Sequence, residues 1–171
     1  MACGDRRGEI EMVAPVQESG AISAGLAHFA DRDAGSGQGM GKRYVAPLVP
    51  LDDLIETLGT VSLIKCDVEG AELLVLRGAR ELLKRSKPTV ICELVPEFLR
   101  GFGVERAHVA AYFRDLGYDA FSMESISGRL RLTPTDFALP GNYLFIHPER
   151  ATRFADLIGE PAGATARTKW G

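Results

Sequence analysis

The sequence has no long apolar segment and no excess of basic residues. No apolar run approaches the roughly 18 residues that a membrane-spanning helix requires. The N-terminus, MACGDRRGEI, also lacks the apolar stretch of a signal peptide. The formal net charge of −3 offers no basic surface for a nucleic acid or an acidic membrane. These absences predict a cytoplasmic protein with no membrane span and no nucleic-acid partner.

Cysteine and histidine are also scarce. The chain has three cysteines and three histidines, and no two cysteines form a C-x-x-C pair. This spacing predicts no metal site. Because Cys66 and Cys92 lie inside apolar runs, we expect both to be buried thiols.

What the sequence does have is enough apolar material for one core. Of 171 residues, 46% are hydrophobic. From residue 61 on, strand and helix patterns alternate. We expect strands at 61–66, 88–94, 118–123 and 142–148, and helices at 71–85 and 105–117. This order predicts a mostly parallel sheet with helices on both faces and an antiparallel last pair of strands.

The first sixty residues are less regular. Residues 8–15 alternate in part and are interpreted as a strand, and a short helix is expected near Leu26. Pro47 and Pro50 place the extended segment around them at a sheet edge. A short helix follows, with Asp52 near its N-terminus. The glycine-rich segment 35–41 has no strand before it and no helix after it, so it is interpreted as a surface loop.

Carboxylates gather where the strand at 61–66 ends. Asp67, Glu69 and Glu72 lie within six positions, and Gly70 permits a tight turn between them. They could simply cap the following helix, and Glu72 is the best candidate for that role. Alternatively, ligands of open α/β sheets bind outside the carboxyl ends of the strands, where Glu93 also lies. For Asp67 the pattern leaves capping and function equally open.

The segments LDDLIETLG, VSLIKCDVEGAELLVLRGARELL and KPTVICEL resemble the FkbM-type methyltransferases. The resemblance is close over residues 51–96 and weaker over ACGDRRGEIEMVAP and NYLFIHP. It implies an α/β fold, the C-terminal portion of a Rossmann-like class I methyltransferase domain, at residues 1–150. Residues 151–171 are expected to form a flexible tail. The family's N-terminal cofactor loop has no counterpart, so we expect it to lie outside this chain.

The resemblance also implies a reaction, namely S-adenosylmethionine-dependent methylation of a hydroxyl oxygen on a small molecule, sugar or lipid. It gives Asp67, Glu93 and Glu69 as candidate catalytic residues, with Asp67 first as base or hydroxyl holder. It gives Gly4, Asp5 and Asp67 as candidate cofactor contacts. Because the cofactor loop is missing, we expect weak S-adenosylmethionine binding or none.

Two alternatives to an enzyme remain. One is a non-catalytic remnant of the fold that serves as an interaction module or has no function. The other, a flavodoxin-like regulatory domain, explains the strand–helix alternation but not the run DVEGAE. In the class I strand order, the strand at 61–67 would lack one neighbour, so self-association through this exposed strand is expected.

Overall fold

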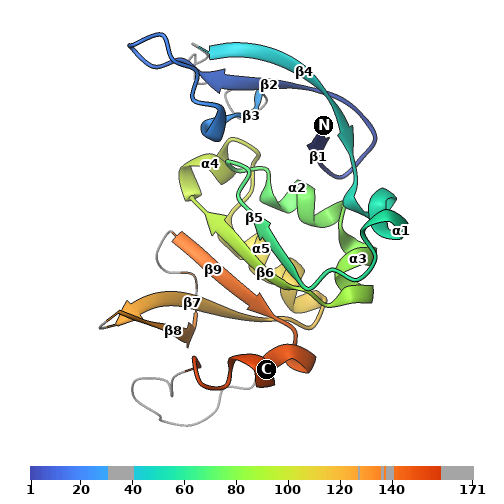
Figure 1. Cartoon of the computed structure of the whole chain (residues 1–171), viewed down its shortest axis with the longest axis vertical. Coiled ribbons are helices and arrows are strands. Elements are labelled where there is room, and N and C mark those ends of the chain that lie inside the picture. Colours follow the sequence, from blue (N-terminus) through green and yellow to red (C-terminus); the bar gives the residue numbers. More distant parts are fainter. Residues whose placement is uncertain (31–40, 127, 136, 138–140, 159–171) are drawn as a thin grey trace.

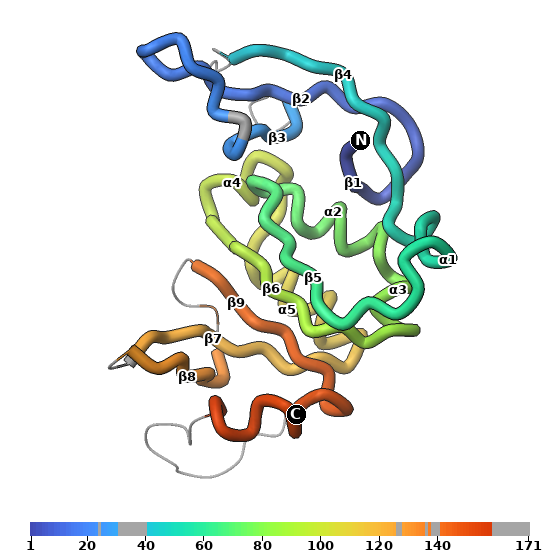
Figure 2. Tube along the Cα trace, in the orientation of Figure 1, coloured from blue at the N-terminus to red at the C-terminus, as the bar shows by residue number. Residues whose placement is uncertain are grey.

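The computed structural model describes residues 1–30, 41–126, 128–135, 137 and 141–158, which form an α/β fold with two sheets (Figure 1). The glycine-rich segment 35–41 lies outside these residues, except for Gly41. The N-terminal sheet lies at one end of the molecule and the last helical segment at the other (Figure 2). No helix in the described part of the chain is long and apolar enough to cross a membrane.

The N-terminal sheet has four strands in the order β1-β4-β2-β3. They are β1 (Ala2–Cys3), β2 (Gly8–Pro15), β3 (His28–Phe29) and β4 (Gly41–Val49), and η1 (Ala24–Leu26) precedes β3. The strand at 8–15 and the helical turn near Leu26 are therefore confirmed. β4 lies between β1 and β2, but β1 pairs only with Leu48 and Val49. At Pro47 the strand β4 therefore has one neighbour among the described residues, which agrees with the expected edge position.

The second sheet has five strands in the order β5-β6-β9-β7-β8. They are β5 (Leu63–Cys66), β6 (Thr89–Leu94), β7 (Asp119–Ile126), β8 (Arg129–Pro134) and β9 (Gly141–Ile146). As expected, β5 and β6 are parallel neighbours and β7 pairs with β9 in antiparallel fashion. The sheet is not mostly parallel, however. Because β9 inserts between β6 and β7, β5–β6 is its one parallel pair among the described strands.

The helical segment after β5 is broken rather than continuous. In place of one helix at 71–85 there are α2 (Glu72–Arg77) and α3 (Arg80–Ser86), separated at Gly78 and Ala79. Asp52 lies in the first turn of a short helical segment, as expected, and it also contacts α3. Its carboxylate accepts hydrogen bonds from the backbone N–H groups of Glu81 (3.0 Å) and Leu82 (2.8 Å), at the start of α3. Asp52 lies in η3 (Leu51–Leu54), which continues into α1 (Ile55–Leu58).

The α-helices cover one face of the five-stranded sheet, and the other face carries only a short 3-10 helix among the described residues. Side chains from α2, α3, α4 (Pro96–Arg100) and α5 (Arg106–Asp115) share one core cluster with Val90, Cys92 and Leu94 of β6. The intervening Ile91 points to the other face. There it packs with a smaller cluster around Phe121, Leu132, Leu144 and Ile146. Cys66 and Cys92 are 2% and 0% exposed, which confirms the prediction of buried thiols.

The second face is covered by the end of the described chain. η4 (Pro148–Phe154) and the residues after it place Phe154, Leu157 and Ile158 against β7, β8 and β9. The backbone N–H of Leu132 donates to the carbonyl of Leu157 at 2.8 Å. Residues 151–158 are therefore part of the fold and not a flexible tail, while residues 159–171 lie outside the described part.

Candidate functional site at the carboxyl ends of β5 and β6

Asp67 and Glu93 lie side by side at one end of the five-stranded sheet. Asp67 follows β5 directly, Glu93 is the second-last residue of β6, and the parallel register pairs Cys66 with Cys92. The two carboxyl groups are close enough for each to shift the pKa of the other. Because Cys92 and Leu94 face the helices, Glu93 lies on the opposite face of β6. The sheet thus brings together the two carboxyl groups that the sequence placed at adjacent strand ends.

The two carboxyl groups ionise differently. Lys65 forms an ion pair with Asp67, and this hydrogen bond lowers the pKa of Asp67 below its ordinary value. The proximity of Asp67 raises the pKa of Glu93, and partial burial and the charge of Glu69 raise it further. Of the two, Asp67 therefore ionises more readily and Glu93 binds a proton more tightly. The arrangement combines an ionised acceptor with a carboxyl group poised to gain or lose a proton.

Lys65 is a site residue that the sequence reasoning missed. A strand alternates its side chains between two faces, so positions 65 and 67 of one strand lie on the same side. The pattern K-x-D at the end of a predicted strand was the available signal. With it, the ion pair of Lys65 and Asp67 could have been predicted.

Glu69 lies in the tight turn between β5 and α2. Its φ of +58° is in the left-handed region, which a residue with a side chain adopts only where its surroundings impose it. Gly70 follows with φ of +106°, and a Cβ there would lie 2.4 Å from the carbonyl oxygen of Phe98. The expected tight turn is confirmed, and only glycine fits it. The turn keeps the charge of Glu69 close enough to act on Glu93.

The side chain of Glu72 stabilises this turn through hydrogen bonds to its backbone. Its side chain is buried, and Oε1 accepts hydrogen bonds from the backbone N–H groups of Val68 (3.1 Å) and Gly70 (3.2 Å). Its Oε2 atom is buried and has no hydrogen-bond partner among the described residues. Burial raises the pKa of Glu72. Glu72 therefore fixes the backbone of the β5–α2 turn, which agrees with the structural role that the sequence favoured.

The two expected cofactor contacts near the N-terminus, Gly4 and Asp5, lie at the C-terminal end of α2. A Cβ on Gly78 would lie 1.8 Å from the carbonyl oxygen of Gly4, so Gly4 touches the C-terminal end of α2. Asp5 is next to it and forms an ion pair with Arg6 at 3.3 Å. Asp67 precedes the other end of α2. The structure therefore groups Asp67, Glu69 and Glu93 but does not bring Gly4 and Asp5 to them.

Comparison with known proteins identifies the family. The model of the methyltransferase FkbM domain matches residues 1–120, which is more than half of the chain. No curated protein and no solved structure matches. The match includes both strands that bear the carboxyl pair and the turn that Glu72 holds. The chain belongs to the FkbM methyltransferase family.

Proposed function

We propose that the Asp67–Glu93 pair is the proton-handling element of an S-adenosylmethionine-dependent methyltransferase that acts on a hydroxyl oxygen. The supporting observation is the pair of carboxyl groups at the carboxyl ends of two adjacent parallel strands, with pKa values shifted in opposite directions, in a chain of the FkbM family. Methylation of a hydroxyl requires the oxygen to be aligned and its proton to be removed. A pair of carboxyl groups with different pKa values can do both.

The two residues have different roles in this proposal, because their pKa values are shifted in opposite directions. Asp67, whose pKa is lowered, stays ionised and can accept a hydrogen bond from the acceptor hydroxyl, which orients the oxygen. Glu93, whose pKa is raised, is the stronger base and takes the proton. Proton transfer to a positioned side chain contributes typically about 10²–10⁴ in rate. Glu69 supports Glu93 by raising its pKa through negative charge.

Gly4 and Asp5 lie at the C-terminal end of α2, and Asp67 precedes its N-terminal end. Six helical residues rise about 9 Å, a span that one S-adenosylmethionine molecule can bridge, so these residues remain candidate contacts of one cofactor. We expect this chain to bind the cofactor weakly or not at all. The second candidate function is a non-catalytic module of the methyltransferase fold.

One assay separates the two functions. The chain is incubated with millimolar S-adenosylmethionine labelled on its methyl group, and label transfer to a panel of hydroxyl compounds is counted. An enzyme transfers label slowly, Glu93→Gln abolishes the transfer, and Glu81→Gln, which removes an exposed carboxylate from α3, leaves it unchanged. No transfer above background would support the non-catalytic module. Micromolar cofactor binding in a calorimetric titration would contradict the expected weak binding.

A further inference from the structure

A groove of about 420 Å³ lies between α2 and α5, next to the loop that precedes α5. This volume is in the range of small-molecule sites. The apolar floor of the groove is formed by Leu73, Phe102, Val104 and Ala111. Leu73 and Val104 are 3% and 8% exposed and belong to the core cluster on the helix-covered side. The floor is therefore part of the packed core and offers apolar contact to a ligand.

The side chains around the floor are held in place by contacts within the chain. The backbone N–H of Phe102 donates to the carbonyl of Leu99 at 3.0 Å, which ties the loop to α4. The hydroxyl of Tyr112, another lining residue, donates to the carbonyl of Leu76 at 2.8 Å. The guanidinium of Arg80 lies over the Tyr112 ring, 5.8 Å from its centroid. Because these groups are already ordered, a ligand pays little to order them.

Basic side chains from both helices line the groove, Arg77 from α2 and His108 from α5. Nδ1 of His108 accepts a hydrogen bond from the backbone N–H of Glu105 at 3.0 Å. The proton of the neutral ring is therefore on Nε2, which is a donor. The guanidinium of Arg77 adds five N–H groups in a planar fork whose geometry matches a carboxylate. Arg77 and His108 can therefore bind the carboxylate of one ligand.

An acidic side chain, Asp115, lines the same groove. It lies seven residues after His108 and therefore on the same side of α5. Within the described part of the chain, the side chains of Asp115 and Arg77 form no ion pair or hydrogen bond, with each other or with a third residue. A carboxylate in the last turn of a helix is also unfavourable, because the carbonyl groups there carry partial negative charge. Helix stability therefore does not account for Asp115, whereas a positively charged ligand group would.

We propose that this groove binds a zwitterionic α-amino acid with an apolar side chain. Its carboxylate contacts Arg77 and His108, its ammonium contacts Asp115, and its side chain lies on the apolar floor. An anion alone would add negative charge next to Asp115, and a cation alone would add positive charge next to Arg77. A zwitterion pairs with both.

This inference is independent of the proposed methyl transfer. The floor belongs to the helix-covered face of the five-stranded sheet, whereas Glu93 lies on the other face. Loss of methyl transfer on replacing Glu93 would therefore leave amino-acid binding unchanged, and the two proposals fail separately.

The test compares three compounds that share a phenyl group. They are phenylalanine, 3-phenylpropionate, which lacks the ammonium, and 2-phenylethylamine, which lacks the carboxylate. Calorimetric titration of the chain should show phenylalanine binding about tenfold more tightly than either of the others, because a hydrogen bond to a charged group contributes on that order. The methyl NMR signal of Ala111 should shift with phenylalanine, which locates the ligand without any substitution.

Two single variants test the charged contacts separately. Arg77→Gln should lose about tenfold in affinity for phenylalanine and 3-phenylpropionate and bind 2-phenylethylamine as before. Asp115→Asn should lose about tenfold for phenylalanine and 2-phenylethylamine and bind 3-phenylpropionate at least as well as before. Unfolding would weaken the binding of all three compounds, so this crossed pattern cannot result from a loss of structure.

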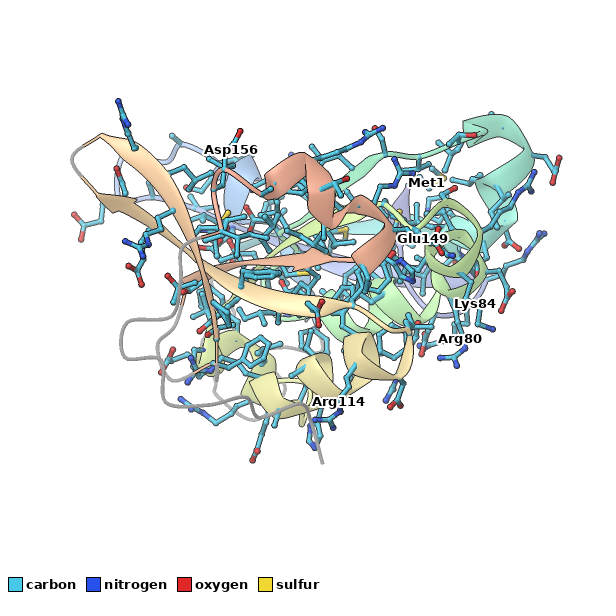
Figure 3. The ribbon with its side chains drawn as sticks, turned by 90° about the horizontal axis from the view of Figure 1, so that it is seen from below. Met1, Arg80, Lys84, Arg114, Glu149 and Asp156 are labelled. Carbon is cyan, nitrogen blue, oxygen red and sulfur yellow. The ribbon has the colours of Figure 1, made fainter. Side chains whose placement is uncertain are left out.

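The matched controls are Arg85→Gln and Asp156→Asn, which should bind all three compounds as the original chain does. Arg85 is an exposed arginine of α3 that pairs with Glu56 at 3.1 Å and does not line the groove. Figure 3 shows Asp156 on the opposite side of the molecule from Arg114, which marks α5. Equal binding of the three compounds, absence of the crossed pattern, or an unshifted Ala111 methyl would each overturn the proposal.

Discussion

Lys65 controls the charge state of the carboxyl pair, because its hydrogen bond is the largest cause of the lowered pKa of Asp67. Asp67 in turn is the largest cause of the raised pKa of Glu93. A residue on the exposed side of a four-residue strand thus determines which of two carboxyl groups is the base. The side chains of Lys65 and Asp67 are 59% and 34% exposed, so solvent and salt weaken this effect.

Replacing Lys65 with Met should raise the pKa of Asp67. The ammonium that favours the ionised form is lost, while the carboxylate partner Glu93 remains. Carboxyl ¹³C NMR titration measures both groups directly, and Lys84→Met, which removes a lysine paired with Glu81, is the control. An unchanged Asp67 titration would show that the ion pair does not form in solution.

Glu72 should make the chain less stable as pH rises. Its pKa is raised by burial, so above the ordinary value of about 4.3 the folded state binds the proton more tightly than the unfolded chain. Its stabilising contribution is therefore present at low pH and is lost as pH rises through the folded-state pKa. Glu72→Gln cannot ionise and lacks this dependence.

The measurement is urea unfolding of both proteins at several pH values. The free energy of unfolding of the original chain, relative to that of Glu72→Gln, should fall between pH 4 and pH 7. Glu81→Gln, which changes a carboxylate that is 63% exposed, provides the comparison for a solvated site. A constant difference between the original chain and Glu72→Gln would mean that Glu72 titrates normally.

Among the elements, the break between α2 and α3 joins the two sheets. At this break the Gly4 carbonyl oxygen approaches Gly78, and the N–H of Gly4 donates to Val49 of β4 at 3.1 Å. The N–H of Asp52 donates to the carbonyl of Gly78 at 2.8 Å. Three segments that are distant in sequence therefore meet at a residue without a side chain.

Gly78→Ala should weaken the packing of the segment around Gly4 against the break between α2 and α3. The backbone φ of −74° suits alanine, but its Cβ would overlap the Gly4 carbonyl, and overpacking of this kind typically destabilises by about 1–3 kcal/mol. Gly25→Ala, at a position with nothing within 4 Å of the new Cβ, is the matched control. Thermal unfolding and amide exchange of Gly4 measure the effect. Equal stability of the two variants would show that β1 does not dock on the helices.

These elements also show what the sequence could and could not predict. The strands β5 and β6 were predicted correctly because apolar runs and a helical pattern between them are local signals. The break at Gly78 was not, because it depends on the close approach of Gly4, which lies far away in sequence. The position of β9 between β6 and β7, and that of β4 inside its sheet, depend in the same way on partners that no local pattern reveals.

The candidate site was predictable to a similar extent. Asp67 and Glu93 were found because strand ends can be read from the pattern, and their contact followed from parallel pairing. The separation of Gly4 and Asp5 from Asp67 could not be found, because it depends on how the N-terminal sheet packs along α2.

At the scale of the whole molecule, β5 is an outer strand of the five-stranded sheet and pairs only with β6 among the described strands. The N–H of Thr89 donates to the carbonyl of Ser62, so the backbone groups of alternate residues Ser62, Ile64 and Cys66 face β6. The backbone groups of Leu63 and Lys65 face outward. Leu63 is 56% exposed, but the strand is short and bears a lysine, and both features discourage strand pairing between chains.

We propose weak self-association through this edge, between β5 strands of two copies. The amides of Leu63 and Lys65 should gain protection from hydrogen exchange as protein concentration rises, and sedimentation should show a dimer. Leu63→Lys should abolish both effects, while Leu58→Lys, at an exposed position on α1, should not. Protection of these two amides at the lowest concentration, or its absence at every concentration, would rule out this edge as the interface.

The insertion of β9 between β6 and β7 also determines when the five-stranded sheet can close. A chain made from its N-terminus completes β5, β6 and the α2–α5 layer first, and β7 with β8 next. Until β9 follows, β6 and β7 have no strand to join them, although the apolar side chains of both are already present. Among the described strands, the one that is synthesised last is therefore the one that joins β6 to β7.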